Sequence, residues 1–356
     1  MATNPNLQAE YNRKQLIGIG LETAFDGYVP PTMFLPTAGI DLIEDKQDLI
    51  QADVPLGKMV RPEQAFSVFG IGKGSVKLKI GEVPWVNALG HIFAQMLTLI
   101  ETTSHIAPDV GAHSHVLTSR ETPGKAMNMD VGLSLTEWDG VLRRKLSGCR
   151  IVGFEIAQEQ NKPATLDLDV EGSTYAEDET SASPAIELLT DTPFLMASQL
   201  TALVDNAAQE IIGCKLAAKF KHTGDDQLQP TGAAARSKID LVQIDDVALT
   251  IKRHLLLDEA GGAFSKYLEA YRAKTAFKSN QLKWEGQVIV GLGSIPWTLQ
   301  FDIAAMRIDK LDDIKQTVVG GAIVEEVTFH AITPTTPKAL LIATVINGSA
   351  TPADQS

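Results

Sequence analysis

The segment Leu166-Asp167-Leu168-Asp169-Val170-Glu171 alternates apolar and acidic residues with a period of two. Successive side chains of a β-strand point to opposite faces of its sheet, so this period is typical of a strand with one buried and one solvated face. The same alternation occurs in Val76-Lys77-Leu78-Lys79-Ile80 and from Trp297 to Ile303. These segments predict a chain that is mainly β.

Six further segments have the alternation or the residue composition of strands. They are Arg150 to Gln158, Ile211 to Phe220, Val247 to His254, Leu282 to Leu292, Ile323 to His330 and Lys338 to Ile346. Two segments instead have helical spacing. The first runs from about Pro84 to Glu101, with Pro84 suited to the first turn. The second starts near Ala263 and repeats apolar residues on one face from Phe264 to Tyr271.

An acidic segment from Ser173 to Thr192 separates two halves of the chain. It has five acidic residues, no basic one, a proline and many Ser and Thr, so we expect an exposed linker. The domains are then 1–172 and 193–356. The residues from Gly148 to Phe154 resemble those from Gly213 to Lys219 in character, and both an internal duplication and chance explain so short a match.

The composition is that of an ordinary globular protein with an acidic balance. The 356 residues carry a formal net charge of −13, which opposes adhesion to a phosphate backbone. The N-terminal residues are polar and lack the apolar region of a secretory signal, so we expect folding in the cytoplasm. Cys149 and Cys214 lie in apolar, strand-like contexts and are predicted to be buried free thiols.

The glycine-rich and carboxylate motifs do not have the arrangement that catalysis needs. Gly18-x-Gly20 is followed by Thr23 where a dinucleotide fingerprint requires glycine, and the segment from Gly70 to Ser75 lacks the residue order of a phosphate loop. Asp245-Asp246 and Glu325-Glu326 are adjacent, so on a strand each pair should point to opposite faces. The sequence predicts a protein that is not an enzyme, with no catalytic residue and no cofactor.

A cluster of histidines offers one possible metal site. His113-Ser114-His115 would place both imidazoles on one face of a strand, and His105 and Asp109 could complete a divalent-metal site. The alternative is a polar loop, which nearby Pro108 and Gly111 favour. We expect the loop and no bound metal.

Several motifs resemble one family. The segment from Gly18 to Phe25 has the pattern Gly-x-Gly-x-Glu-Thr-x-Phe and leads to Phe34-Leu35-Pro36. A strand-like Gly74 to Ile80 then precedes the first helix, and a turn at Trp138 leads to the Gly-Cys strand that ends at Phe154. In this order the segments are similar to the tail tube (major tail) proteins of long-tailed, siphophage-like bacteriophages.

The resemblance implies a β-sandwich or barrel tail-tube fold with two tube-like modules, whose strands close a β-barrel between subunits. It also implies homotrimeric, pseudo-hexameric or homohexameric rings that stack into a hollow tube. The tube would pass double-stranded DNA without specific binding during genome ejection. Implied partners are a tape-measure protein, a tail terminator and distal tail or baseplate proteins, and the location is the virion after assembly in the host cytoplasm. The alternative is a β-rich virion decoration or receptor- or carbohydrate-binding module.

Two sets of residues follow from the resemblance as candidate sites. Asp167, Asp169, Glu171 and Asp302 are candidates for lining the lumen, with an ordinary solvated outer face as the alternative. The long connection from Thr37 to Ala65 is expected to project toward the neighbouring ring. Its candidate inter-ring contacts are Asp41, Glu44, Asp45, Asp48, Asp53 and Arg61.

Overall fold

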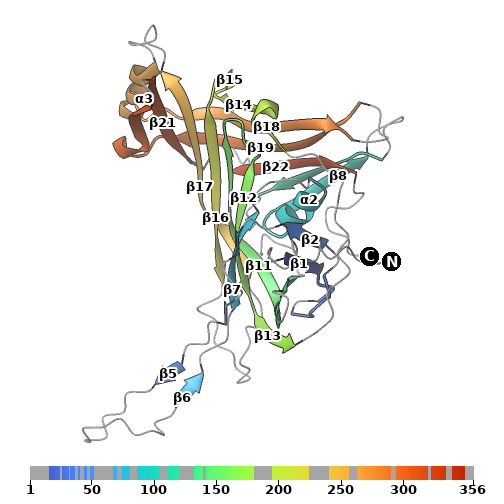
Figure 1. Cartoon of the computed structure of the whole chain (residues 1–356). Helices are drawn as coiled ribbons and strands as arrows, with labels where there is room; N and C mark the ends of the chain where they lie inside the picture. The colour runs from blue at the N-terminus through green and yellow to red at the C-terminus, as the bar shows by residue number, and fades with distance from the viewer. Residues whose placement is uncertain are drawn as a thin grey trace, which may run out of the picture.

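A computed structural model shows a mostly β protein with short helices (Figure 1). It describes residues 16–24, 26–31, 33–36, 39–40, 44–45, 49–51, 67–69, 74–80, 86–104, 111–119, 132–138, 142–179, 195–223, 240–255, 263–289, 294–319, 322–333 and 339–348. Every strand pairing within these ranges is antiparallel. The prediction of a mainly β chain is confirmed, whereas the large sheet is open and forms no closed barrel by itself.

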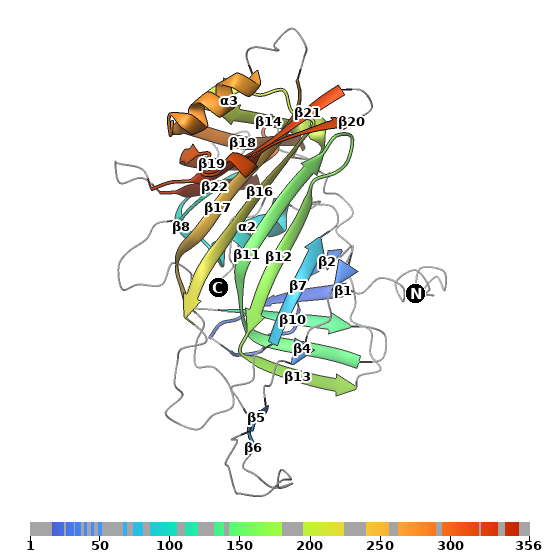
Figure 2. The same cartoon turned by 90° about the vertical axis from the view of Figure 1, so that its left-hand side faces the viewer.

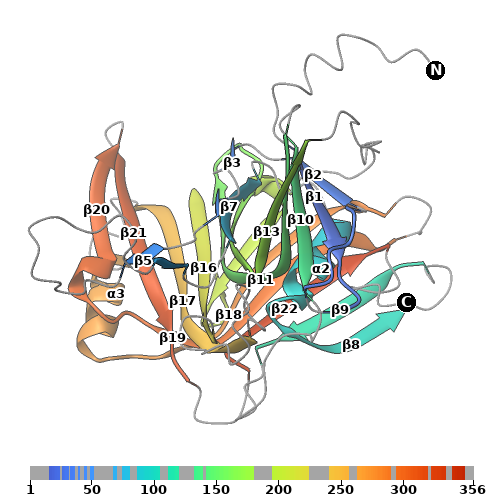
Figure 3. The same cartoon turned by 90° about the horizontal axis from the view of Figure 1, so that it is seen from below.

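One run of paired strands, here called the long sheet, forms one side of the molecule (Figure 2). From one edge to the other, its strands are β7 (Gly74–Ile80), β12 (Thr165–Gly172), β11 (Leu142–Glu159), β16 (Gly213–Thr223), β17 (Asp240–Leu255), β21 (Ala322–Ala331) and β20 (Ile314–Val319). Two short strands, β3 (Gly39–Ile40) and β4 (Glu44–Asp45), lie beside β7. Figure 3 shows the row of strands from β11 through β16, β17 and β21 to β20.

A second run, the cross sheet, packs against the long sheet. Its strands are β15 (Ala207–Ala208), β14 (Leu200–Val204), β18 (Phe277–Val288), β19 (Pro296–Arg307), β22 (Leu341–Asn347), β9 (His113–Thr118) and β8 (Thr98–Ser104). β19 also pairs with the end of β21, where Met306 lies opposite Ala331. The two sheets are therefore joined at this corner by backbone pairing.

A third group, the lower sheet, uses the first part of β11. Its strands are β2 (Met33–Pro36), β1 (Leu16–Leu21), β10 (Leu133–Trp138), β11 and β13 (Thr174–Glu179). β11 can serve two sheets because it bends near Gly148, whose φ of 62° is readily adopted only by glycine. A separate two-stranded ribbon, β5 (Leu49–Gln51) with β6 (Ser67–Phe69), lies beyond this end in Figure 1.

The core lies between the long and cross sheets. Phe154 of β11 stacks on Phe301 of β19 with ring centroids 5.8 Å apart. Phe93 of α2 (Val86–Ala94) makes edge contacts with both rings at 5.3 Å. On the other side of the corner, Tyr267 of α3 (Ala263–Arg272) packs edge-on against Phe329 of β21 at 5.5 Å. The two helices thus fill the openings between the sheets.

The element predictions hold for strands and for one helix. All nine segments predicted as strands contain strands, and the helix predicted near Ala263 begins there. The helix predicted from Pro84 to Glu101 is wrong in extent, because α2 ends at Ala94 and β8 begins at Thr98. The Gln95 and Met96 N–H groups bond to carbonyls three residues back, which tightens and ends the helix. Thr98, Ile100 and Thr102 are β-branched and favour a strand.

The acidic linker also differs from the prediction. Residues 174–179 form β13 rather than an exposed linker, and Ser173 is buried; residues 180–192 lie outside the described residues. Strands from the two sides of this segment pair directly, since β11 lies beside β16 and β9 lies beside β22. The division into domains 1–172 and 193–356 stays a prediction, with a shared sheet and a shared core across it.

Candidate functional site

The acidic residues of β12 lie on the solvated face of the long sheet. Asp167, Asp169 and Glu171 are half-buried, and they alternate with the fully buried Leu166, Leu168 and Val170. The hydrophobic effect fixes this register, because a shift by one residue would place three aliphatic side chains in water. The alternation in the sequence therefore predicted the face of each side chain correctly.

This face carries charges of both signs. Asp167 and Asp169 lie opposite Lys79 and Lys77 of β7 in the strand register. On the other side, Glu155 of β11 forms an ion pair with Lys215 of β16, with an Nζ–Oε2 distance of 2.7 Å. Opposite charges on neighbouring strands stabilise the pairing slightly and leave no continuous basic track. The described part of the face is therefore mixed in charge rather than uniformly acidic.

Asp302 lies on a different surface from the β12 acids. It belongs to β19 of the cross sheet, between the buried Phe301 and Ile303, and it accepts hydrogen bonds from Gln281 Nε2 (2.8 Å) and Gln300 Nε2 (2.7 Å). The core faces of the two sheets point toward each other, so their polar faces point apart. Asp302 and the β12 acids of one subunit therefore lie on different sheets, and the assignment of these four residues to a lumen stays a prediction.

The candidate inter-ring residues are only partly described. Glu44 and Asp45 form β4, next to Ser75 and Gly74 at the start of β7. The other four candidates lie outside the described residues: Asp41, Asp48, Asp53 and Arg61. The backbone of β4 places its two acidic residues at the edge of the long sheet.

The opposite edge of the long sheet is an exposed strand. Among the described strands, β20 pairs only with β21, so one row of its N–H and C=O groups has no strand beside it. Val318 of β20 is 73% exposed, and Ile323, which lies opposite it on β21, is 36% exposed. Soluble proteins usually protect such edges with charges, prolines or bulges. β20 has one exposed charge, Lys315, and ends in the uncharged Thr317-Val318-Val319. An exposed apolar edge of this kind can accept a strand of another chain.

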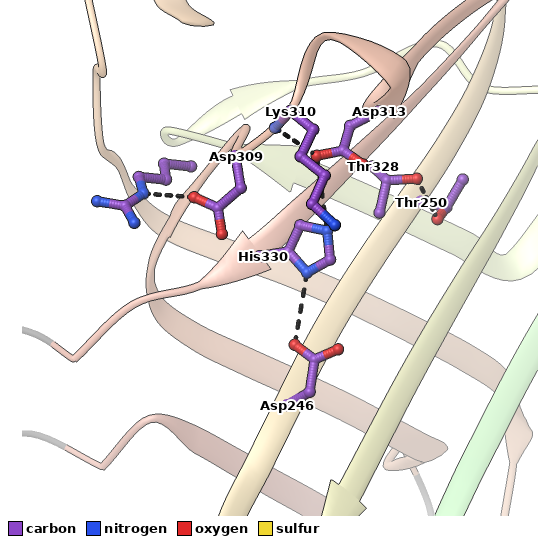
Figure 4. A network of polar contacts seen from close by, with 8 residues as sticks. Asp246, Thr250, Asp309, Lys310, Asp313, Thr328 and His330 are labelled. Atoms are coloured by element: carbon purple, nitrogen blue, oxygen red, sulfur yellow. Dashed lines mark hydrogen bonds and ion pairs between the residues drawn. The ribbon is translucent and has the colours of Figure 1, made fainter.

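A polar network attaches β20 to the sheet behind it (Figure 4). His330 of β21 points one ring nitrogen toward Asp246 of β17 (Nδ1–Oδ1 3.4 Å) and the other toward Asp313 (Nε2–Oδ2 3.7 Å). Asp313 ends the short 3₁₀ helix η3 (Leu311–Asp313) that leads into β20, and it accepts the Lys310 N–H at 2.8 Å. The network fixes the start of the edge strand, and the sequence alone gave no signal for it because its members come from three separate segments.

The glutamate of the first sequence motif is a buried structural anchor. Glu22 is 2% exposed, and its carboxylate accepts hydrogen bonds from Ser134 Oγ and Gly148 N, both at 2.8 Å, and from Asp26 N at 2.9 Å. Burial raises the pKa of the Glu22 carboxyl, although the three hydrogen bonds act in the opposite direction. The carboxylate thereby holds the loop after β1 against the bend of β11.

Asp26 extends the same anchor to a third strand. Its two carboxylate oxygens accept Ser147 Oγ of β11 at 2.7 Å and Thr174 Oγ1 of β13 at 2.8 Å. In β1, a Cβ on Gly20 would lie only 2.5 Å from the Val29 carbonyl oxygen, so glycine is needed for close backbone approach. The motif organises the lower sheet, and its glycines serve packing.

The paired carboxylates behave in two ways. Glu325 is buried and bonded to Arg253 (Nη2–Oε2 2.8 Å), while Glu326 points to the solvated face and pairs with Lys252, which confirms opposite faces. Asp245 and Asp246 are both exposed, so burial does not assign them to opposite faces, and the prediction for this pair stays a prediction. The register between β16 and β17 shifts at this point, and a β-bulge breaks the alternation of faces.

The histidine segment is a strand, so the prediction of a polar loop is wrong. His113 and His115 of β9 stack with ring centroids 6.4 Å apart. Both nitrogens of the buried His115 have neutral partners, Thr102 Oγ1 and Asn347 Oδ1, each at 3.1 Å. His105 and Asp109 lie outside the described residues, and within those that are described no group of three or more ligating side chains could hold a metal ion.

The two cysteines are buried and free, as predicted. Burial raises the pKa of the Cys214 thiol to about 12 and that of Cys149 well above its ordinary value, so both stay protonated and unreactive. Neither helix in the described ranges has the length and the apolar run needed to cross a bilayer. The sequence matches no description of a known protein family and no curated protein.

Proposed function

We propose that this chain is a structural virion protein that assembles into stacked rings and forms the hollow tail tube of a long-tailed bacteriophage. The observation that carries the proposal is the open long sheet, with an exposed apolar strand, β20, at one edge. An open sheet can satisfy its edges by pairing with the next subunit, and repeating that contact around an axis closes a barrel. Three or six copies would complete such a ring.

The other edge of the long sheet is the second half of this proposed contact, and two short strands already lie along it. On that side of β7, the described strands β3 and β4 pair only with its two ends, at Lys79 and Leu78 and at Ser75 and Gly74. In the proposed ring, β20 of one subunit adds to this edge of its neighbour, beside β3 and β4.

The solvated face of the long sheet would then line the lumen. This assignment retains Asp167, Asp169 and Glu171 and excludes Asp302, which lies on the other sheet. A face that mixes acids with lysines offers phosphates no continuous positive surface, so a duplex could pass without being held. A tape-measure protein in the lumen and a terminator at the end of the tube would set its length.

The test is assembly of the purified full chain. We expect hollow rings or tubes by negative-stain microscopy, and a sedimentation rate that rises with protein concentration. Val318→Lys should raise the concentration needed for assembly at least tenfold, since it places a charge on the apolar edge. The subunit should remain folded by circular dichroism, because Val318 is already exposed.

Val288→Lys is the matched control, since Val288 is another exposed valine, 46% accessible, on β18 of the cross sheet. It should assemble like the wild type. Monomers of the wild type at every concentration, with a bound carbohydrate, would contradict the proposal and favour a decoration or receptor-binding module. Equal assembly of the Val318→Lys chain would contradict the role of β20.

A further inference from the structure

A basic hollow lies where the C-terminal end of α3 meets the end of β19. Its volume is about 350 Å³, and it is lined by Tyr271, Arg272, Lys274, Arg307, Ile308 and Asp309. Two of the cations come from the end of α3 and the third from the end of β19. Three cations and one carboxylate give the lining a surplus of positive charge in a chain whose net charge is −13.

The positive charge of this hollow is only partly balanced. Arg307 Nε bonds to Asp309 Oδ1 at 2.5 Å, which orients the guanidinium. Within the described part of the chain, neither Arg272 nor Lys274 forms an ion pair, and both are exposed. The hollow therefore has at least two cations available to an incoming carboxylate.

Lys274 occupies a backbone position that favours glycine. Its φ is 51°, and the bonds Lys274 N to Tyr271 O (3.1 Å) and Thr275 N to Ala270 O (2.9 Å) form the Schellman motif that ends α3. Glycine is the usual residue at this position because it adopts a positive φ without strain. A cation near a helix C-terminus does interact favourably with the helix dipole. That effect does not account for Arg307, which comes from another element.

The strand β13, near the opposite end of the molecule, ends in an acidic sequence. Figures 1 and 2 show α3 at the top of the molecule and β13 near the bottom. The strand β13 ends in Glu177-Asp178-Glu179 and, among the described strands, pairs only with β11. Arg144 contacts Glu177 (Nε–Oε1 3.6 Å), so this residue is partly neutralised, and Asp178 and Glu179 follow it at the end of the strand.

We propose that the basic hollow of one subunit receives the acidic end of β13 from a second copy of this chain, in a head-to-tail contact along the long dimension of the molecule. This inference rests on the proposed tube, because the contact would join one ring to the next. The two surfaces lie at opposite ends and carry opposite charge, so the contact repeats without closing. Such a contact weakens as salt rises, because exposed ion pairs are screened.

The test uses full-length chains that also carry Val318→Lys, so that ring formation and head-to-tail association are measured separately. Arg272→Glu with Lys274→Glu reverses the hollow, and Asp178→Lys with Glu179→Lys reverses the end of β13. By analytical ultracentrifugation, each double variant should associate at least tenfold more weakly than the parent. The chain with all four changes should regain the association, because its two ends are complementary again.

Lys278→Glu is the control, since Lys278 is exposed on β18 and lies outside the hollow. It should associate like the parent, and circular dichroism should show every variant folded. Unchanged association in either double variant overturns the inference, as does a failure of the fourfold variant to recover. Absence of any salt-sensitive association in the parent also overturns it. If chains without Val318→Lys still form rings in those cases, the proposed function stands while the inference fails.

Discussion

At the scale of single residues, buried carboxylates connect segments that are far apart in the sequence. Glu22 was recognisable only as part of a sequence motif, and its partners Ser134 and Gly148 lie more than a hundred positions away. Local periodicity carries no information about such distant partners. The motif therefore identified Glu22 as notable but did not predict its role as a buried hydrogen-bond acceptor. The same holds for Glu325, whose partner Arg253 lies on a neighbouring strand.

Glu22 should make stability depend on pH in an unusual direction. Burial raises its pKa above the ordinary value of 4.5, so the folded chain keeps the proton at a pH where the unfolded chain releases it. The resulting stabilisation is complete below about pH 4.5 and is lost as the pH rises through the folded-state pKa.

Glu22→Gln mimics the protonated carboxyl and has no titration of its own. The free energy of unfolding of the wild type, measured by urea denaturation relative to this variant, should fall as the pH rises above about 4.5. If the free energy of unfolding of the wild type instead rises relative to that of Glu22→Gln above about pH 4.5, the hydrogen bonds to the carboxylate outweigh its burial.

At the scale of elements, the sequence predicted strands better than their boundaries and neighbours. The alternation from Leu166 to Glu171 identified a strand and its buried face, because both depend on local period. The apolar run before Glu101 looked helical throughout, because a helix and a buried strand give similar runs of apolar residues. The bulge at Asp245 and the edge strand β20 depend on pairing with distant segments, which periodicity does not reveal.

A substitution at the end of α3 should change the stability of the subunit and its head-to-tail association in opposite directions. Lys274→Gly should raise the free energy of unfolding by about 1 kcal/mol, because glycine removes the strain of a positive φ. The same change removes a cation of the hollow and should weaken head-to-tail association. Thermal unfolding and sedimentation of one sample measure both effects. Lys274→Ala separates them, since it removes the charge and keeps the strained backbone.

At the scale of the whole molecule, the two halves of the chain share one structure. Phe154 from the first half stacks on Phe301 from the second, and Phe93 packs on both. The acidic composition of the segment from Ser173 to Thr192 predicts a boundary there, and that division stays a prediction, because composition indicates exposure and carries no information about strand pairing. The fold class followed from the sequence, whereas the pairing of β11 with β16 did not.

The shared core predicts cooperative unfolding. The full chain should unfold in one transition in which near-ultraviolet and far-ultraviolet circular dichroism coincide, because neither half can bury its core residues alone. Fragments 1–172 and 193–356 should each be unfolded or aggregated when expressed separately. Two resolved transitions, or one fragment with the near-ultraviolet signal of the intact chain, would favour independent domains.

The position of β22 also has a consequence for the timing of folding. This strand, Leu341–Asn347, lies between β9 and β19. The strand β9, His113–Thr118, can pair with β22 only after more than two hundred further residues have been synthesised. Contacts so distant in sequence slow folding, because a long loop must close before they form. The cross sheet is therefore completed late in synthesis, and during that interval one edge of β9 in the nascent chain lacks its partner strand and is open to a chaperone.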